Sequence, residues 1–185
     1  MCLYIELIQN INVNNRQIVY IHGLNSSANS KKFKSILKVY PSAICIEWKT
    51  DDNITTILND AYEHLKGVVE DLTIIGSSTG GNFGWQLQKK LKEHGKSSEL
   101  VLLNPLVDVS LKYEDNFPEN LAHYLAVMNR FEHTKVFIGV HDEVLNAEKS
   151  KQFFEIQQKI FPDQIEIIEV DDNHRIENFE SLLTL

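Results

Sequence analysis

The sequence predicts an α/β fold with a mostly parallel β-sheet and helices on both of its faces. Short apolar runs rich in β-branched residues alternate with longer amphipathic segments, which is the pattern of consecutive βαβ units. Several apolar runs are followed directly by glycine, serine, histidine or acidic residues, as at the carboxyl edge of a parallel sheet. The length of 185 residues suits one domain with a sizeable core. We therefore expect a single domain over residues 1–185, with a short cap insertion at about 106–133.

The apolar runs are short, and runs of this length with many β-branched residues predict buried strands. In chain order, the strands are expected at residues 17–21, 43–47, 72–75, 100–103, 136–140 and 165–169. Asn104 and Pro105 end the fourth of them, because proline is excluded from the middle of a sheet. A further edge strand is expected at residues 3–8.

The amphipathic segments between the strands predict helices. Ser30 and Asn53 are suited to cap two of them, because their side-chain oxygens can accept a bond from the first turn. After Asn53 the apolar residues recur at spacings of three and four, so one stripe of that helix faces the core. The expected helices run from Ser30 to Val39, from Asn53 to about Gly67, from the glycine-serine segment to His94, and over about 147–161 and 177–183, with a weaker one at about 120–127.

Composition and charge argue against several classes of function. The net charge is −8 and, apart from residues 31–34, the basic residues are scattered, which disfavours a nucleic-acid groove or binding to an anionic membrane. No run approaches the roughly 18 apolar residues of a membrane helix. Cys2 and Cys45 do not make a disulfide framework, and the N-terminal segment lacks a basic leader and carries Glu6 in its apolar part. We expect a protein of the reducing cytoplasm, with Cys45 as a small core residue.

Residues 76–80, GSSTG, fit the G-x-S-x-G pattern of a nucleophile elbow between a strand and a helix, and only Ser78 takes the central position. The flanking glycines matter because side chains two residues before and after the serine would collide with neighbouring backbone in so sharp a turn. The alternative is a glycine-rich connection without chemistry. The place of the segment, after a buried strand and before an amphipathic helix, favours the elbow.

Asp142 and His174 follow two later strands, at the edge of the sheet where Ser78 is expected. Together they give the order Ser…Asp…His along the chain, which is the order in α/β-hydrolases. The histidine would accept the serine proton, and the carboxylate would fix the histidine tautomer. Glu143 and Asp108 stay open as alternative acids. Without such a partner, His174 would be a surface-loop histidine.

Several segments of the chain resemble the small YqiA-like esterases of the α/β-hydrolase superfamily. These segments are YIHGLNSSANSKK, GSSTGGNFGWQL, LNP, HDEVL and NHRIENFE, and the resemblance extends from about Ile18 to the C-terminus. It implies a compact α/β-hydrolase fold and the hydrolysis of carboxylic esters or thioesters. It also implies Ser78, Asp142 and His174 as the catalytic triad, without a metal.

The oxyanion of the reaction would be held by two backbone N–H groups, those of Leu24 and Thr79. Apolar side chains of the insertion are expected to form one wall of a small or half-open substrate pocket, with Leu24 opposite. These side chains are Phe117, Leu121, Tyr124 and Leu125.

The leading interpretation is a serine hydrolase that acts on a small-molecule acyl ester or thioester and needs no cofactor. A peptidase or amidase on the same triad stays open, because the acylation chemistry is shared. So does a non-catalytic small-molecule binding module with a vestigial triad, because one fold hosts many functions. A metal site is not expected, since the remaining histidines lack paired ligand spacing; they are His64, His94, His123, His133 and His141, with His22 expected to be structural.

Overall fold

The computed structural model describes residues 16–114 and 116–179. They contain one six-stranded sheet with the strand order β2-β1-β3-β4-β5-β6, in which every neighbouring pair is parallel. The strands are β1 (Arg16–Ile21), β2 (Ile44–Ile46), β3 (Asp71–Ser77), β4 (Glu99–Leu103), β5 (Thr134–Gly139) and β6 (Ile165–Val170). The predicted fold class is confirmed, and these six strands lie where the apolar runs predicted them, with ends shifted by at most two residues.

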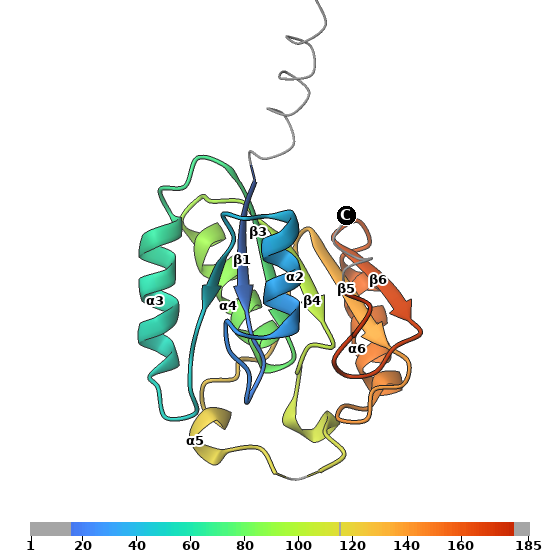
Figure 1. Cartoon of the computed structure of the whole chain (residues 1–185). Helices are drawn as coiled ribbons and strands as arrows, with labels where there is room; N and C mark the ends of the chain where they lie inside the picture. The colour runs from blue at the N-terminus through green and yellow to red at the C-terminus, as the bar shows by residue number, and fades with distance from the viewer. Residues whose placement is uncertain (1–15, 115, 180–185) are drawn as a thin grey trace, which may run out of the picture.

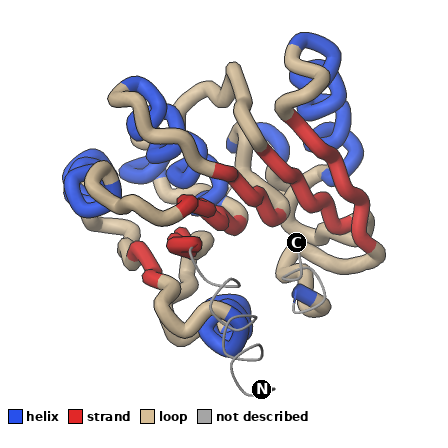
Figure 2. The backbone as a smooth tube through the Cα atoms, turned by 90° about the horizontal axis from the view of Figure 1, so that it is seen from above, coloured by secondary structure: helices blue, strands red, loops and turns tan. Residues whose placement is uncertain are grey.

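Helices cover both faces of the sheet (Figures 1 and 2). One face carries α2 (Lys31–Val39), and the other carries α3 (Ile54–Leu65), α4 (Thr79–Glu93) and α6 (Ala147–Ile160).

The pleat of β1 explains why there are two separate cores. Its side chains alternate between the faces, so Val19 and Ile21 pack in the core shared with α3, α4 and α6. Ile18 and Tyr20 pack in the core shared with α2, where the ring of Tyr20 stacks on Phe33 with the centroids 5.8 Å apart. Burial of both faces is the reason that the central strands β1, β3, β4 and β5 are mostly apolar.

The caps of the helices follow the sequence prediction. Ser30 Oγ accepts a hydrogen bond from the backbone N–H three residues later, and Asn53 Oδ1 does the same for α3. Asn146 caps α6 in the same way. Beyond the end of α4, Gly95 has a φ of 82°, in the left-handed region that glycine adopts without strain.

The insertion between β4 and β5 lies beyond the carboxyl ends of the strands (Figure 1). It contains a 3₁₀ turn, η1 (Val109–Leu111), and one short helix, α5 (Glu119–Ala122), so the helix expected at 120–127 is much shorter than predicted. The reason is that side chains of α4 form hydrogen bonds with the backbone that would have continued this helix. Gln86 Nε2 donates to the Tyr124 carbonyl at 2.9 Å, and the amide of Asn82 both donates to the Ala126 carbonyl and accepts from its N–H.

Two predicted elements lie at the ends of the chain. The edge strand at residues 3–8 and Cys2 lie outside the described residues. The helix expected at 177–183 lies outside them beyond Phe179, and residues 177–178 form a turn. Cys45 is a free thiol in β2 that packs against the core on the α2 face, and burial, with a smaller effect of Glu47, raises its pKa to about 12. No helix in the described part of the chain is long and apolar enough to cross a membrane.

Candidate active site

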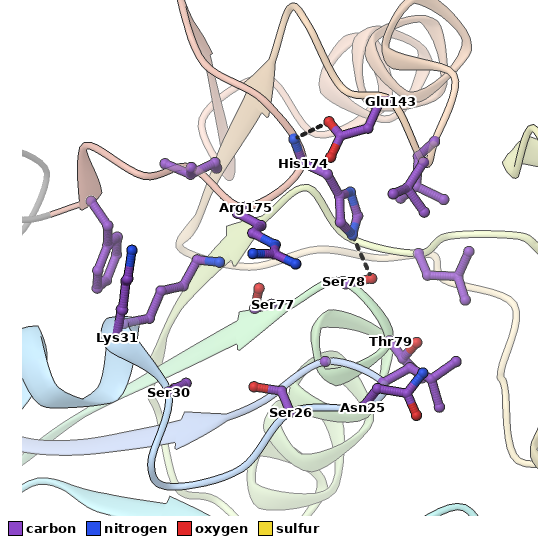
Figure 3. Close-up of a pocket in the computed structure, with 18 of the residues that line it drawn as sticks. Asn25, Ser26, Ser30, Lys31, Ser77, Ser78, Thr79, Glu143, His174 and Arg175 are labelled. Carbon is purple, nitrogen blue, oxygen red and sulfur yellow. Dashed lines mark hydrogen bonds between the residues drawn. The ribbon is translucent and has the colours of Figure 1, made fainter.

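Ser78 stands alone between the end of β3 and the start of α4, with φ 53° and ψ −122°. This conformation is strained for a residue with a side chain and persists only where the surroundings enforce it. Its N–H donates to the Leu103 carbonyl at 2.9 Å, and its carbonyl accepts from the N–H groups of Gly81 at 2.8 Å and Leu106 at 3.0 Å. The backbone of Ser78 is therefore fully bonded, and its hydroxyl is held toward the cavity that Figure 3 shows.

The glycines around the elbow are required by close backbone contacts. A β-carbon on Gly76 would lie 2.5 Å from the carbonyl oxygen of Gly80. A β-carbon on Gly80 would overlap the carbonyl oxygens of Ile21 and His22 at the end of β1. Both glycines of the G-x-S-x-G pattern are thus sterically obligatory, as the sequence predicted.

The side chains of Ser78, His174 and Asp142 form one hydrogen-bonded chain. His174 Nε2 lies 3.1 Å from Ser78 Oγ (Figure 3), and His174 Nδ1 lies 2.8 Å from Asp142 Oδ2. The other carboxylate oxygen of Asp142 accepts the N–H groups of Val144 and Leu145, both at 2.8 Å. Because Asp142 is an acceptor, the proton of a neutral His174 ring sits on Nδ1, which leaves Nε2 to accept from the serine hydroxyl.

The two alternative acids are bonded elsewhere. The Glu143 carboxylate accepts the backbone N–H of His174 at 3.0 Å, so it positions the loop and does not bond to the ring (Figure 3). Asp108 caps η1 by accepting the N–H of Ser110 at 2.7 Å. Of the three candidates, the geometry brings only Asp142 to the imidazole.

His22 organises the loop that faces the elbow. His22 is 1% exposed and its ring stacks on Trp48; Nδ1 donates to the Gly23 carbonyl at 2.8 Å, and Nε2 accepts the backbone N–H of Trp48 at 3.2 Å. Burial lowers the pKa of His22, which suits this neutral tautomer. The Gly23 carbonyl and the Leu24 N–H belong to one planar trans peptide and point in opposite directions. Since the ring holds the carbonyl, the Leu24 N–H is turned away from the ring.

Residues 17–136 match the model of an uncharacterised protein family, UPF0227, which is the YqiA-like family. The chain belongs to this family. No curated protein matches the chain.

Solved structures with low sequence identity share the architecture. Est1E from Butyrivibrio proteoclasticus superposes with a TM-score of 0.67 at 14% identity, over 95% of this chain and 86% of that one. A YdeN-like hydrolase from Pectobacterium atrosepticum gives 0.66 at 14% identity, over 97% and 95% of the two chains. YbtT, a type II thioesterase of the yersiniabactin pathway, gives 0.65 at 12% identity, over 94% and 92%. This member of the YqiA-like family therefore has the α/β-hydrolase fold.

Asn104 is a site residue that the sequence did not single out beyond its role in ending β4. Its side chain is 3% exposed and joins three loops, because Nδ2 donates to the carbonyls of Asn173 and His174, both at 3.0 Å, and Oδ1 accepts the Gly139 N–H at 2.7 Å. Its φ of 42° lies in the left-handed region, which asparagine tolerates better than most residues. The signals in the sequence were its place before a proline at a strand end and the segment LNP of the family resemblance.

A cavity of about 610 Å³ opens at Ser78, between the β1–α2 loop, the insertion and the loops after β5 and β6. Leu24 and Phe117 line it, as predicted, together with Leu106, Val144 and Leu145.

The other three residues expected in the pocket need correction. Leu121, Tyr124 and Leu125 do not line the cavity. Leu121 is fully buried in the core, and Tyr124 and Leu125 pack against that core, because the bonds from α4 draw this segment down onto the helix. Within residues 16–114 and 116–179, no group of three or more His, Cys, Asp or Glu side chains is arranged to hold a metal ion.

Proposed function

We propose that the protein is a serine hydrolase that cleaves carboxylic esters or thioesters through an acyl-enzyme on Ser78. The observation that carries this proposal is the unbroken chain of hydrogen bonds from Ser78 Oγ through His174 to Asp142, at 3.1 and 2.8 Å, with the serine on a strained elbow of φ 53°. A serine hydroxyl is a poor nucleophile until a neighbouring imidazole accepts its proton. Three residues that are 32 to 96 positions apart meet here in the geometry that this proton transfer needs.

In the proposed acylation step, Ser78 Oγ attacks the substrate carbonyl carbon while its proton passes to His174 Nε2. Asp142 stabilises the imidazolium that forms. When the tetrahedral intermediate collapses, the bond to the leaving oxygen or sulfur breaks and His174 returns the proton to that atom. A water molecule then repeats the sequence on the acyl-enzyme, with His174 as base, and releases the carboxylic acid and free Ser78.

The N–H groups of Leu24 and Thr79 are the proposed oxyanion hole. The Leu24 N–H has no hydrogen-bond acceptor among the described residues, and the His22 ring fixes its direction through Gly23. Thr79 is the first residue of α4, so its N–H is one of those that a helix leaves unpaired, at the positive end of the helix dipole. Gly23 lets this loop lie close to the elbow, since a β-carbon there would lie 3.1 Å from the β-carbon of Ser78.

The names of the structural neighbours agree with acyl chemistry. Est1E has been solved with ferulic acid bound, and YbtT is a type II thioesterase. Esters and thioesters share the same acyl-enzyme, so one triad serves both. We place the reaction in the cytoplasm, where the free thiol of Cys45 would stay reduced.

Labelling with a fluorophosphonate tests this proposal, because a serine that a base has activated attacks its phosphorus, displaces fluoride and becomes phosphonylated. We expect one label per chain, on the peptide that contains Ser78, and none on Ser78→Ala. Ser77→Ala is the matched control and should still be labelled, since no imidazole bonds to Ser77. Folded protein that stays unlabelled would contradict the proposal and favour a binding module with a vestigial triad.

A further inference from the structure

The cavity at Ser78 is cationic although the chain as a whole is acidic. Four basic side chains line it, against two acidic ones, in a protein with a net charge of −8. The basic ones are Lys31, Lys32, Lys112 and Arg175, and the acidic ones are Glu143 and Glu177. Among the described carboxylates, none forms an ion pair with any of the four basic side chains. Excess positive charge inside a concave site attracts anions.

Lys32 and Arg175 are close enough to repel one another. The pKa of Lys32 is lowered to about 8, first by burial and then by the charge of Arg175, while Asp172 and Glu177 oppose the shift. Asp172 is engaged elsewhere, because its carboxylate accepts the N–H groups of Asn173 and Asn178. Two cations held together at a cavity wall, without a carboxylate bonded to either, form a site that an anion would stabilise.

The position of Arg175 shows which part of a substrate would meet these cations. Arg175 directly follows His174, and Figure 3 shows both side chains directed into the cavity toward Ser78. His174 must return its proton to the leaving atom, so the leaving group lies on the His174 side of the serine. The apolar lining residues Leu106, Phe117 and Val144 come from other loops and leave an uncharged wall for the acyl group.

We propose that Lys32 and Arg175, with Lys31 beside them, form a subsite for a negatively charged group on the leaving part of the substrate. The group would be a carboxylate or a phosphate, since both accept from an arginine and a lysine together. This inference rests on the proposed function, because it names the substrate class of the same Ser78 site.

A pair of esters that differ only in this charge tests the subsite. The probes are 3-butyryloxybenzoate and its methyl ester, which share the acyl group and the ring of the leaving phenol. We expect the ratio of kcat/KM, acid over methyl ester, to fall about tenfold in Arg175→Gln and several-fold in Lys32→Gln, since each loses a charged contact. Lys34→Gln is the matched control, because Lys34 lies on the same helix, is exposed and does not line the cavity; its ratio should stay at the wild-type value.

Two further arms identify the anion and its place. 3-Butyryloxyphenyl phosphate replaces the carboxylate with a phosphate. The anion whose ester loses more kcat/KM in Arg175→Gln is the one that the subsite prefers. In 4-nitrophenyl hydrogen adipate and its methyl ester, the charge is on the acyl side. A charge preference that is confined to the adipate pair would overturn the proposal, as would an unchanged ratio in both Arg175→Gln and Lys32→Gln.

A binding measurement separates the failure of the subsite from the failure of the hydrolase. Calorimetric titration of Ser78→Ala protein with 3-hydroxybenzoate and with its methyl ester requires no turnover. Tighter binding of the acid, lost on adding Arg175→Gln, supports the subsite even if no ester is cleaved. Equal binding of both compounds overturns it, even if esters are cleaved.

Discussion

The proposed reaction centre and the walls of the cavity are built in different ways. At the reaction centre, Ser78, His174 and Asp142 are joined at 3.1 and 2.8 Å, and the side chain of Asp142 is only 2% exposed. The walls come from the first turn of α2, from the insertion and from the loops after β5 and β6, where side chains such as Lys31, Phe117 and Arg175 keep partial or full exposure. We infer that backbone contacts at the strand ends fix the geometry of the proposed triad, whereas the exposed side chains of the walls are suited to set substrate choice. Substitutions in the triad should therefore lower kcat by orders of magnitude, and substitutions in the walls should shift selectivity between substrates.

The largest of these effects is expected for Asp142→Asn. The amide can keep the bonds from Val144 and Leu145, but its NH₂ group then faces His174 Nδ1 and forces the wrong tautomer. We expect a loss of about 10⁴-fold in kcat with an intact fold, measured by steady-state kinetics and circular dichroism. Glu143→Gln is the control, since that side chain reaches only the backbone of His174. If Glu143→Gln proved the more damaging change, the acid would be misassigned.

A smaller effect, on both stability and rate, is expected for Asn104→Ala. This change leaves the Gly139 N–H and the carbonyls of Asn173 and His174 without their buried partner. We expect the free energy of unfolding to fall by about 1–3 kcal/mol, and kcat to fall about ten- to a hundredfold because the His174 loop loses its anchor. Urea denaturation and initial rates measure the two losses. Asn29→Ala, at an exposed loop position, should change neither; an equal effect there would refute the anchoring role.

At the apolar wall, the length of the acyl chain should matter only over a short range. Each methylene gains about 0.8 kcal/mol, or about fourfold in kcat/KM, while it still finds apolar surface. The surface of Leu24, Leu106 and Phe117 in a cavity of about 610 Å³ is limited. We expect kcat/KM to rise from acetyl to roughly butyryl or hexanoyl esters and then to flatten. A steady rise through dodecanoyl esters would reveal a deeper channel and favour a long-chain acyl thioesterase.

At the cationic wall, the smallest effect is a dependence of charge preference on pH. The pKa of Lys32 is about 8, below its usual value, so its charge is complete at lower pH and disappears as the pH rises through about 8. The other charged groups that act on Lys32 are Arg175, Asp172 and Glu177. The acid-over-methyl-ester ratio of kcat/KM should therefore fall a few-fold from about pH 7 to about pH 9. His174 cancels in this ratio, and Lys32→Gln should remove the step; a ratio that stays constant in wild type would contradict the role of Lys32.

What could be predicted from the sequence also differs between the triad and the walls of the cavity. The sequence predicted the fold and the meeting of Ser78, Asp142 and His174, because strand ends gather at one edge and a sharp turn demands glycine at fixed spacing. It missed the role of Asn104 and the course of the insertion, which depend on bonds between residues 38 to 70 positions apart. The stretch at residues 31–34 was noticed, but its nearness to Arg175 arises only when α2 and the loop after β6 fold together.

The central claim is that Ser78 carries the acyl group, and trapping of the acyl-enzyme tests it most directly. Rapid mixing with 4-nitrophenyl butyrate should give a burst of nitrophenolate equal to the enzyme concentration, if deacylation is the slower step. Acid quenching followed by peptide mass spectrometry reads out the same intermediate without that condition. We expect butyrylation of the peptide with Ser78, in wild type and in Ser77→Ala, and none in Ser78→Ala. Turnover of the ester with the butyryl group found on another residue, or undiminished turnover by Ser78→Ala, would contradict it.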